Sequence, residues 1–182
     1  MTLSKALLPS QTLAARALMV LGGAAVIALA ARVSVPMYPV PMTLSTLAVL
    51  LVGLTMGWRL GFAAVLAYIA EAAVGLPVLA PGSVLGGPTT GFIIGFLPMV
   101  ALAGLAADLG ARRFVPALLA SVAASLMIYV PGVLWLDAVT PLSLGGAIEK
   151  GMLPFIAGDM AKSVLAALAV SGGWALLGRA RS

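Results

Sequence analysis

The 182-residue sequence contains no cysteine and no histidine. Without cysteine there are no disulfide bonds, and without either residue the usual zinc ligands are missing. Catalysis by a Ser-His or Cys-His pair is excluded for the same reason. The sequence also lacks the G-x-x-x-x-G-K-[ST] motif, so it offers no P-loop for ATP. The sequence therefore offers neither the common catalytic pairs nor a Cys or His metal site, and no metal is expected.

Charged residues are also scarce. They make up 8% of the chain, while 63% is hydrophobic and the mean hydropathy is +1.20; soluble domains carry about 25% charged residues. This composition predicts a single integral-membrane domain over residues 1–182, embedded in the lipid bilayer. The net charge of +5 does not indicate nucleic-acid binding, because the basic residues are scattered and only Arg112 and Arg113 are adjacent.

Hydropathy predicts an all-α fold, a compact bundle of six transmembrane helices. A spanning helix needs about 20 mostly apolar residues. The predicted spans are 12–33, 43–57, 60–75, 91–107, 114–136 and 153–177. The second and third are short for a full crossing, and Pro98 predicts a kink in the fourth.

The distribution of basic residues predicts that both termini are cytoplasmic. With the N-terminus inside, two basic residues, Arg32 and Lys150, lie outside. Seven lie inside: Lys5, Arg16, Arg59, Arg112, Arg113, Arg179 and Arg181. A secretory signal ending near residues 28–30 is an alternative interpretation of the first span. A retained helix is simpler, because five further spans follow.

Two outside loops have unusual compositions. Residues 34–43 include three prolines within six positions, which forbids helix and imposes a stiff, extended course. Residues 76–91 include Gly86, Gly87 and Thr89, and a loop of this length is typically functional or mobile. Gly86-Gly87 is not a phosphate-binding motif, since no strand precedes it and no lysine follows. A plain solvated turn remains the alternative for this second loop.

Asp159 and Lys162 are opposite charges within the last span. A charge at the bilayer centre costs about 2.5–3.5 kcal/mol on translocon scales. Positions i and i+3 share a helix face, and both residues fall in the outer half of the hydrocarbon core. We expect a pocket that opens outward, where Lys162 neutralises a ligand carboxylate and Asp159 accepts N–H groups. The alternatives are an ion pair that only neutralises itself, or Asp159 paired with another base.

Weaker signals lie in the first and third spans. Ala24-x-x-x-Ala28 is a small-residue pattern that permits close helix approach, for a partner or for internal packing. Arg32 and Glu71, near outer helix ends, either line the cavity or mark the membrane interface.

Four groups of residues together resemble the BioY family, the biotin-specific substrate-binding (S) components of energy-coupling factor (ECF) transporters. They are Pro39-Val40-Pro41-Met42-Thr43-Leu44, Gly75-Leu76-Pro77-Val78, Gly86-Gly87-Pro88-Thr89 with Gly91-Phe92, and Pro154-Phe155 with Gly158-Asp159 and Lys162. The resemblance covers nearly the whole chain. Two departures stand out: Ser45 replaces the family's usual glutamine, and the glycine loop is shorter.

The resemblance implies a multi-pass S component in a prokaryotic inner membrane that binds biotin from outside. It also implies a protein that is not an enzyme and has no cofactor, because biotin is the transported ligand. Its partners would be a transmembrane coupling protein and two ABC-type ATPases. The site residues it implies are Asp159, Lys162, Thr43, Gly86, Gly87 and Thr89, with Ala24 and Ala28 as candidates for contacting the coupling protein. Alternatives are the transport of another vitamin or amphipathic acid, and less favourably an intramembrane enzyme.

Overall fold

The structure, a computed structural model, describes residues 2–7 and 12–179. These residues form helices and one pair of two-residue strands. The elements are α1 (Leu3–Leu7), α2 (Leu13–Arg32), β1 (Ser34–Val35), β2 (Met42–Thr43), α3 (Ser45–Met56), α4 (Trp58–Ala73), α5 (Thr90–Asp108), α6 (Phe114–Met127), α7 (Tyr129–Val139), α8 (Leu144–Gly151) and α9 (Leu153–Arg179). The all-α prediction is confirmed. Within the described part, four helical stretches are long and apolar enough to cross a membrane: Leu13–Arg32, Thr90–Asp108, Phe114–Val139 and Leu144–Gly178.

The observed helices differ from the predicted spans in three ways. The fifth span divides into α6 and α7 at Ile128, because Pro131 has no N–H to donate to the carbonyl of Met127. The connection predicted at Trp58-Arg59 lies inside α4. Neither α1 nor α8 was predicted, since five and eight residues are too few for a hydropathy signal.

A single residue, Gly57, connects α3 to α4. Its φ is +83°, a conformation that residues with a Cβ rarely adopt. A Cβ here would also lie 2.8 Å from a carboxylate oxygen of Asp108. That carboxylate accepts the backbone N–H of Trp58 at 3.1 Å, which satisfies one free donor at the start of α4. The end of α5 therefore fixes the turn between α3 and α4.

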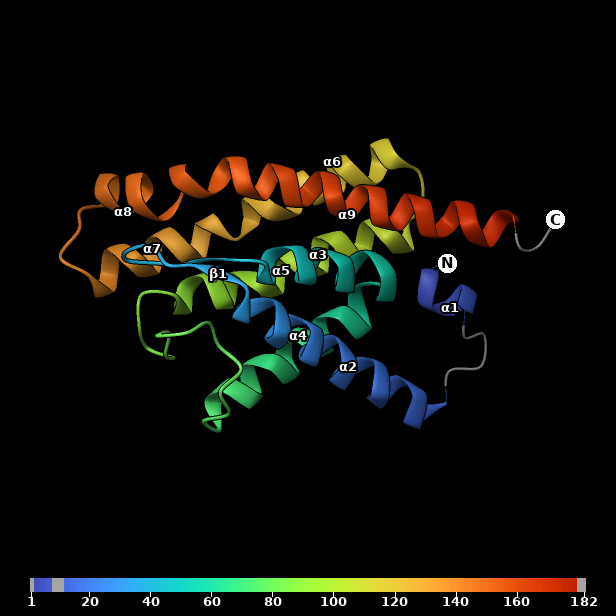
Figure 1. The fold of residues 1–182 in the computed structure, drawn as a ribbon, viewed down its shortest axis with the longest axis horizontal. Helices are drawn as coiled ribbons and strands as arrows, with labels where there is room; N and C mark the ends of the chain where they lie inside the picture. Colours follow the sequence, from blue (N-terminus) through green and yellow to red (C-terminus); the bar gives the residue numbers. More distant parts are fainter. Residues whose placement is uncertain (1, 8–11, 180–182) are drawn as a thin grey trace.

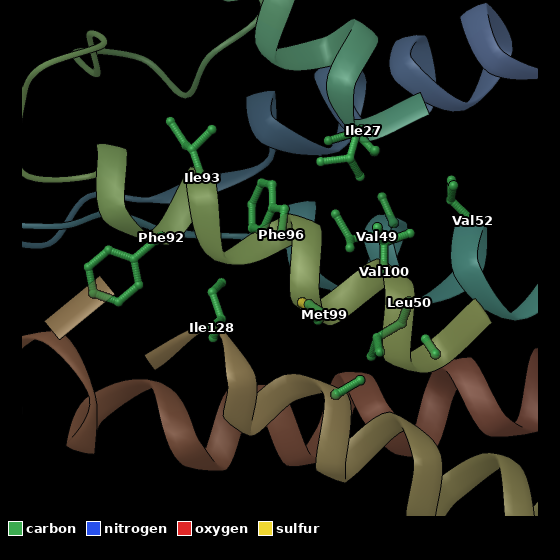
Figure 2. Close-up of a cluster of buried hydrophobic side chains, with 14 of the residues drawn as sticks. Ile27, Val49, Leu50, Val52, Phe92, Ile93, Phe96, Met99, Val100 and Ile128 are labelled. Atoms are coloured by element: carbon green, nitrogen blue, oxygen red, sulfur yellow. The ribbon is translucent and has the colours of Figure 1, made fainter. Parts of the chain in front are cut away.

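The core is built around α5. Figure 2 shows Phe96, Met99 and Val100 of this helix beside Val49 and Leu50 of α3. All five side chains are at least 95% buried. Most of α5 is buried against other helices, and its exposed positions, which include Ile94 and Leu105, are apolar as well.

Glycines allow α5 and α7 to cross at very short distance. A Cβ at Gly91 would lie 2.3 Å from the Cβ of Trp135, and one at Gly132 would lie 2.4 Å from the ring of Phe92. Side chains at either position would push the helices apart. The Gly91-Phe92 motif therefore has a packing role in this structure.

The small residues of α2 face the bundle. Ala24 has no exposed surface, and Ala28 is partly buried against the same core. A Cβ at the neighbouring Gly23 would lie 2.8 Å from the Cβ of Ala64, so α2 and α4 are in close contact. Of the two uses considered for the Ala24-x-x-x-Ala28 pattern, internal packing is the one seen here.

The special loops gather at one end of the bundle. Figure 1 shows the proline loop, the glycine loop and α8 at the same end, with α1 and the C-terminal end of α9 at the other. β1 pairs with β2 in antiparallel register, Ser34 with Thr43 and Val35 with Met42, which closes the proline loop. Arg181, one of the basic residues used to predict orientation, lies outside the described residues.

Candidate functional site

Asp159 and Lys162 form a buried ion pair on α9. The ammonium nitrogen of Lys162 is 3.0 Å from Oδ1 of Asp159, and the side chains are 9% and 4% exposed for lysine and aspartate respectively. The prediction that they share a helix face is confirmed. Both face inward, and both line a cavity.

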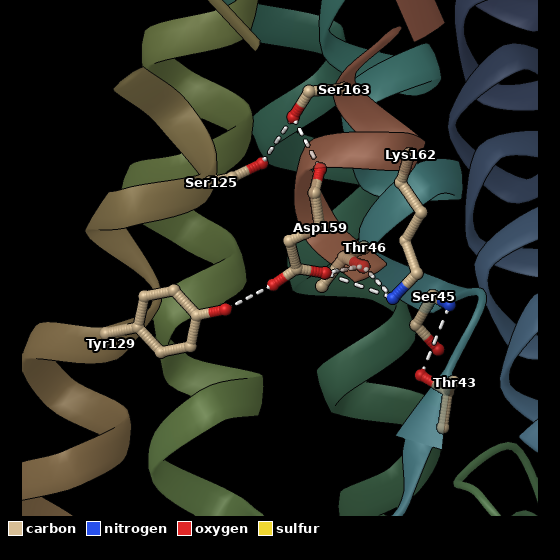
Figure 3. Close-up of polar contacts among 8 residues, drawn as sticks. All are labelled: Thr43, Ser45, Thr46, Ser125, Tyr129, Asp159, Lys162 and Ser163. Carbon is tan, nitrogen blue, oxygen red and sulfur yellow. Dashed lines mark hydrogen bonds and ion pairs between the residues drawn. The ribbon is translucent and has the colours of Figure 1, made fainter. Parts of the chain in front are cut away.

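Two residues from other helices complete the hydrogen bonding of this pair (Figure 3). The hydroxyl of Thr46 on α3 donates to Oδ1 of Asp159 and accepts from Lys162, both at 3.0 Å. The hydroxyl of Tyr129 on α7 donates to Oδ2 at 2.6 Å. We call Thr46, Tyr129, Asp159 and Lys162 the polar cluster. It joins three helices at one point inside an apolar bundle.

A second set of hydroxyls lies next to the polar cluster. Ser163 donates to the backbone carbonyl of Asp159 at 2.8 Å, and its oxygen is 3.2 Å from that of Ser125 on α6. Both serines are almost fully buried. They hold α6 against α9 and fix the turn of helix that carries Asp159, while neither lines the cavity. We therefore assign them a structural role.

The cavity beside the polar cluster, called here the inner cavity, has a volume of about 70 Å³. Its walls are mostly apolar, with a few polar groups that converge, as is typical of small-molecule sites. The apolar lining includes Ala31, Val40, Leu79, Phe92, Ile93, Phe96 and Phe155, and the polar lining Thr43, Ser45, Thr46, Tyr68, Thr89, Tyr129, Asp159 and Lys162.

Four of the six predicted ligand-binding residues lie together in this lining: Thr43, Thr89, Asp159 and Lys162. Sequence reasoning missed Thr46, Tyr68 and Tyr129. A hydroxyl at the loop-proximal end of an apolar helix was the available signal for Thr46 and Tyr68. Tyr129 lies mid-span and gave no signal beyond its nearness to Pro131.

Gly86 and Gly87 do not line the inner cavity. The N–H of Gly86 donates to the hydroxyl of Thr90 at 2.8 Å, and the carbonyl of Gly87 accepts the indole N–H of Trp135 at 3.0 Å. Gly86 has a φ of +88°. In this structure the two glycines shape the loop that leads into α5.

The geometry of the polar cluster bears on the roles predicted for Asp159 and Lys162, and those roles stay predictions. Placing Lys162 on a carboxylate and Asp159 on N–H groups at the other end of a ligand requires the two side chains to be well separated. They are 3.0 Å apart. Two side chains this close together favour a ligand group that meets both of them.

Thr89 has an unsatisfied hydroxyl at the cavity wall. Its Oγ1 is the one buried side-chain nitrogen or oxygen, among the residues that the structure describes, with no hydrogen-bond partner. Buried polar atoms are rarely left unpaired, because an unmade hydrogen bond costs about 1–3 kcal/mol. This position supports Thr89 as a ligand-binding residue.

We expect Thr89→Val to weaken ligand binding about three- to tenfold while leaving the folded protein at least as stable, since the free protein loses an unpaired hydroxyl. Calorimetric titration and thermal unfolding measure the two effects. Thr140→Val is the control, because Thr140 bonds a backbone carbonyl and lies away from the cavity. Unchanged affinity in Thr89→Val would show that this hydroxyl does not meet the ligand.

Comparison with known proteins agrees with this architecture. A family model described as the BioY family matches residues 4–179. The biotin transporter BioY of Rhodobacter capsulatus is 40% identical over an alignment of 166 residues, covering 80% of this chain and 85% of that protein. Biotin transporter BioY2 of Lactococcus lactis is 35% identical over 147 residues, covering 79% and 81% respectively.

The fold is also that of a solved protein. The chain is similar to the crystal structure, at 2.1 Å, of the S-component for biotin from an ECF-type ABC transporter, with a TM-score of 0.76 at 24% identity. The likeness covers 86% of this chain and 88% of that one. Sequence, family model and fold thus agree over most of the chain's length, and the chain belongs to the BioY family.

Proposed function

We propose that this chain is the biotin-binding membrane component of an ECF-type transporter and that it captures biotin from the extracytoplasmic side. The observation that carries the proposal is the polar cluster, buried in an apolar cavity beneath two special loops. Membership of the BioY family and the names of its relatives support biotin as the ligand.

The ureido end of biotin has the hydrogen-bonding groups that the inner cavity could bind. A ureido group has two N–H donors and one carbonyl acceptor, and the fused ring beside it is apolar. Asp159 would accept hydrogen bonds from the ureido N–H groups, and Lys162 would donate one to the ureido carbonyl. Each of these hydrogen bonds would involve a charged side chain and would therefore be strengthened by that charge. Phe92, Phe96 and Phe155 would contact the ring. Thr43 and Thr89 supply further hydroxyls.

We further propose six crossings of a prokaryotic inner membrane, with both termini cytoplasmic. The crossings are α2, α3, α4, α5, α6 with α7, and α9. At 1.5 Å per residue, the 12-residue α3 is only about 18 Å long. Its loop-side flank, including Thr43, lines the cavity, and irregular backbone is tolerated at membrane depth where it lines a cavity. The clustering of the loops at one end supports this orientation.

The proposed partners are a transmembrane coupling protein and two ABC-type ATPases. The absence of a P-loop in the sequence supports an external energy source. A contact between the coupling protein and Ala24 and Ala28 stays a prediction. Because both residues face the bundle, such a contact would require α2 to rotate about its own axis. The part of α2 that faces outward beside them includes Ala25 and Leu29.

Purified protein is expected to bind biotin in one-to-one stoichiometry by calorimetric titration, and mass spectrometry of the released ligand should recover biotin unmodified. A panel of other vitamins at equal concentration should not displace it. Displacement by another vitamin would assign a different ligand to the same fold. Recovery of a chemically altered ligand would indicate an intramembrane enzyme instead.

A further inference from the structure

A second, larger cavity lies on the other side of the glycine loop. This outer cavity, of about 330 Å³, lies between the end of α2, the end of α4 and the loop. It shares Leu79, Ala80 and Ser83 with the inner cavity. Residues 79–83 are therefore the partition between the two spaces. A ligand longer than the inner cavity would reach the outer one if this short segment shifted.

The inner cavity is poorly suited to a carboxylate. Lys162 is its source of positive charge, and that charge is already paired with Asp159 at 3.0 Å. A carboxylate close enough to bond Lys162 would also lie close to the negative charge of Asp159, and like charges in a low-dielectric site repel strongly. The pair suits a neutral group that both donates and accepts hydrogen bonds.

Arg32 supplies positive charge to the outer cavity. Among the described residues that line either cavity, the charged ones are Arg32, Asp159 and Lys162. Among the described residues, Arg32 makes one hydrogen bond, which its guanidinium donates to the backbone carbonyl of Pro77. A guanidinium has five N–H donors in a planar fork that matches a carboxylate. Most of that donor capacity is available to a ligand.

We infer that Arg32 binds the carboxylate end of the ligand in the outer cavity, while the ligand's neutral end lies at the Asp159–Lys162 pair. The inference rests on the proposed function and adds a second subsite to it. The two subsites lie on either side of the partition at residues 79–83, so the ligand spans it when bound. Arg32, which the sequence left as either cavity lining or interface marker, becomes a specificity-determining residue for acids.

A thermodynamic cycle tests the inference with two ligands and two proteins. Biotin and its neutral amide are titrated into the wild-type protein and into Arg32→Gln. We expect Arg32→Gln to weaken biotin binding about three- to tenfold, a modest factor because Arg32 is exposed, and to leave biotinamide binding unchanged. Lys150→Gln is the matched control, since it removes an exposed positive charge that lines neither cavity.

The other outcomes overturn the inference. Equal weakening of both ligands by Arg32→Gln would mean that Arg32 acts by holding the loop at Pro77. An unchanged affinity for biotin would mean that the carboxylate lies elsewhere. If the wild-type protein binds neither ligand, the proposed function itself fails, which separates that failure from a failure at Arg32 alone.

Discussion

Asp159→Asn is expected to weaken biotin binding by about a hundredfold or more. Asp159 holds the polar cluster together, because its two carboxylate oxygens accept hydrogen bonds from Thr46, Tyr129 and Lys162. Asparagine keeps the shape, but its NH₂ group cannot accept from a hydroxyl or an ammonium. Hydrogen bonds to charged groups contribute about 1.5–3 kcal/mol each, and about 2.7 kcal/mol corresponds to a hundredfold change in affinity.

Calorimetric titration with biotin measures this effect, and size-exclusion chromatography in detergent checks that the variant is folded. Glu149→Gln is the matched control, because it removes an exposed negative charge that lines neither cavity. Wild-type affinity in a folded Asp159→Asn protein would refute the assignment of the polar cluster as the binding site.

Lys162→Met is expected to lower the free energy of unfolding by about 3–5 kcal/mol and to abolish measurable biotin binding. Methionine preserves most of the side-chain length but leaves Asp159 as an uncompensated charge whose side chain is 4% exposed. Breaking a buried pair by removing one partner is strongly destabilising for this reason. Equilibrium unfolding in mixed micelles measures the loss, and Lys150→Met is the exposed control.

The double variant, Asp159→Asn with Lys162→Met, separates stability from binding. It removes both charges, so it should recover at least half of the stability that Lys162→Met loses, while biotin binding remains absent. A double variant as unstable as Lys162→Met would show that the two charges do not act as a unit. Recovered binding would show that the ligand needs neither charge.

The candidate site was predicted through rules that act locally. Proline at positions 36, 39 and 41 restricts the backbone wherever it occurs, and an ion pair at i and i+3 must share a helix face. Because a charge inside a bilayer is costly, Asp159 and Lys162 were then predicted to have a function. These effects needed no knowledge of which helices are neighbours.

The partners of the pair could not be predicted in this way. Thr46 is 113 residues from Asp159 along the chain and Tyr129 is 30, so their contacts depend on how α3, α7 and α9 pack. The same limit explains Gly86 and Gly87, whose composition indicated a ligand but whose backbone groups bond Thr90 and Trp135. Hydropathy also could not place the break at Ile128, because both halves of that span are equally apolar.

The single glycine between α3 and α4 has a consequence for transport. One residue, Gly57, connects α3 to α4, and Asp108 at the end of α5 accepts the first N–H of α4, so the three helices are held together at that end of the molecule. The loops at the opposite end, residues 34–43 and 74–89, connect their helices through many more residues, so we expect a rearrangement that opens the cavity to occur there.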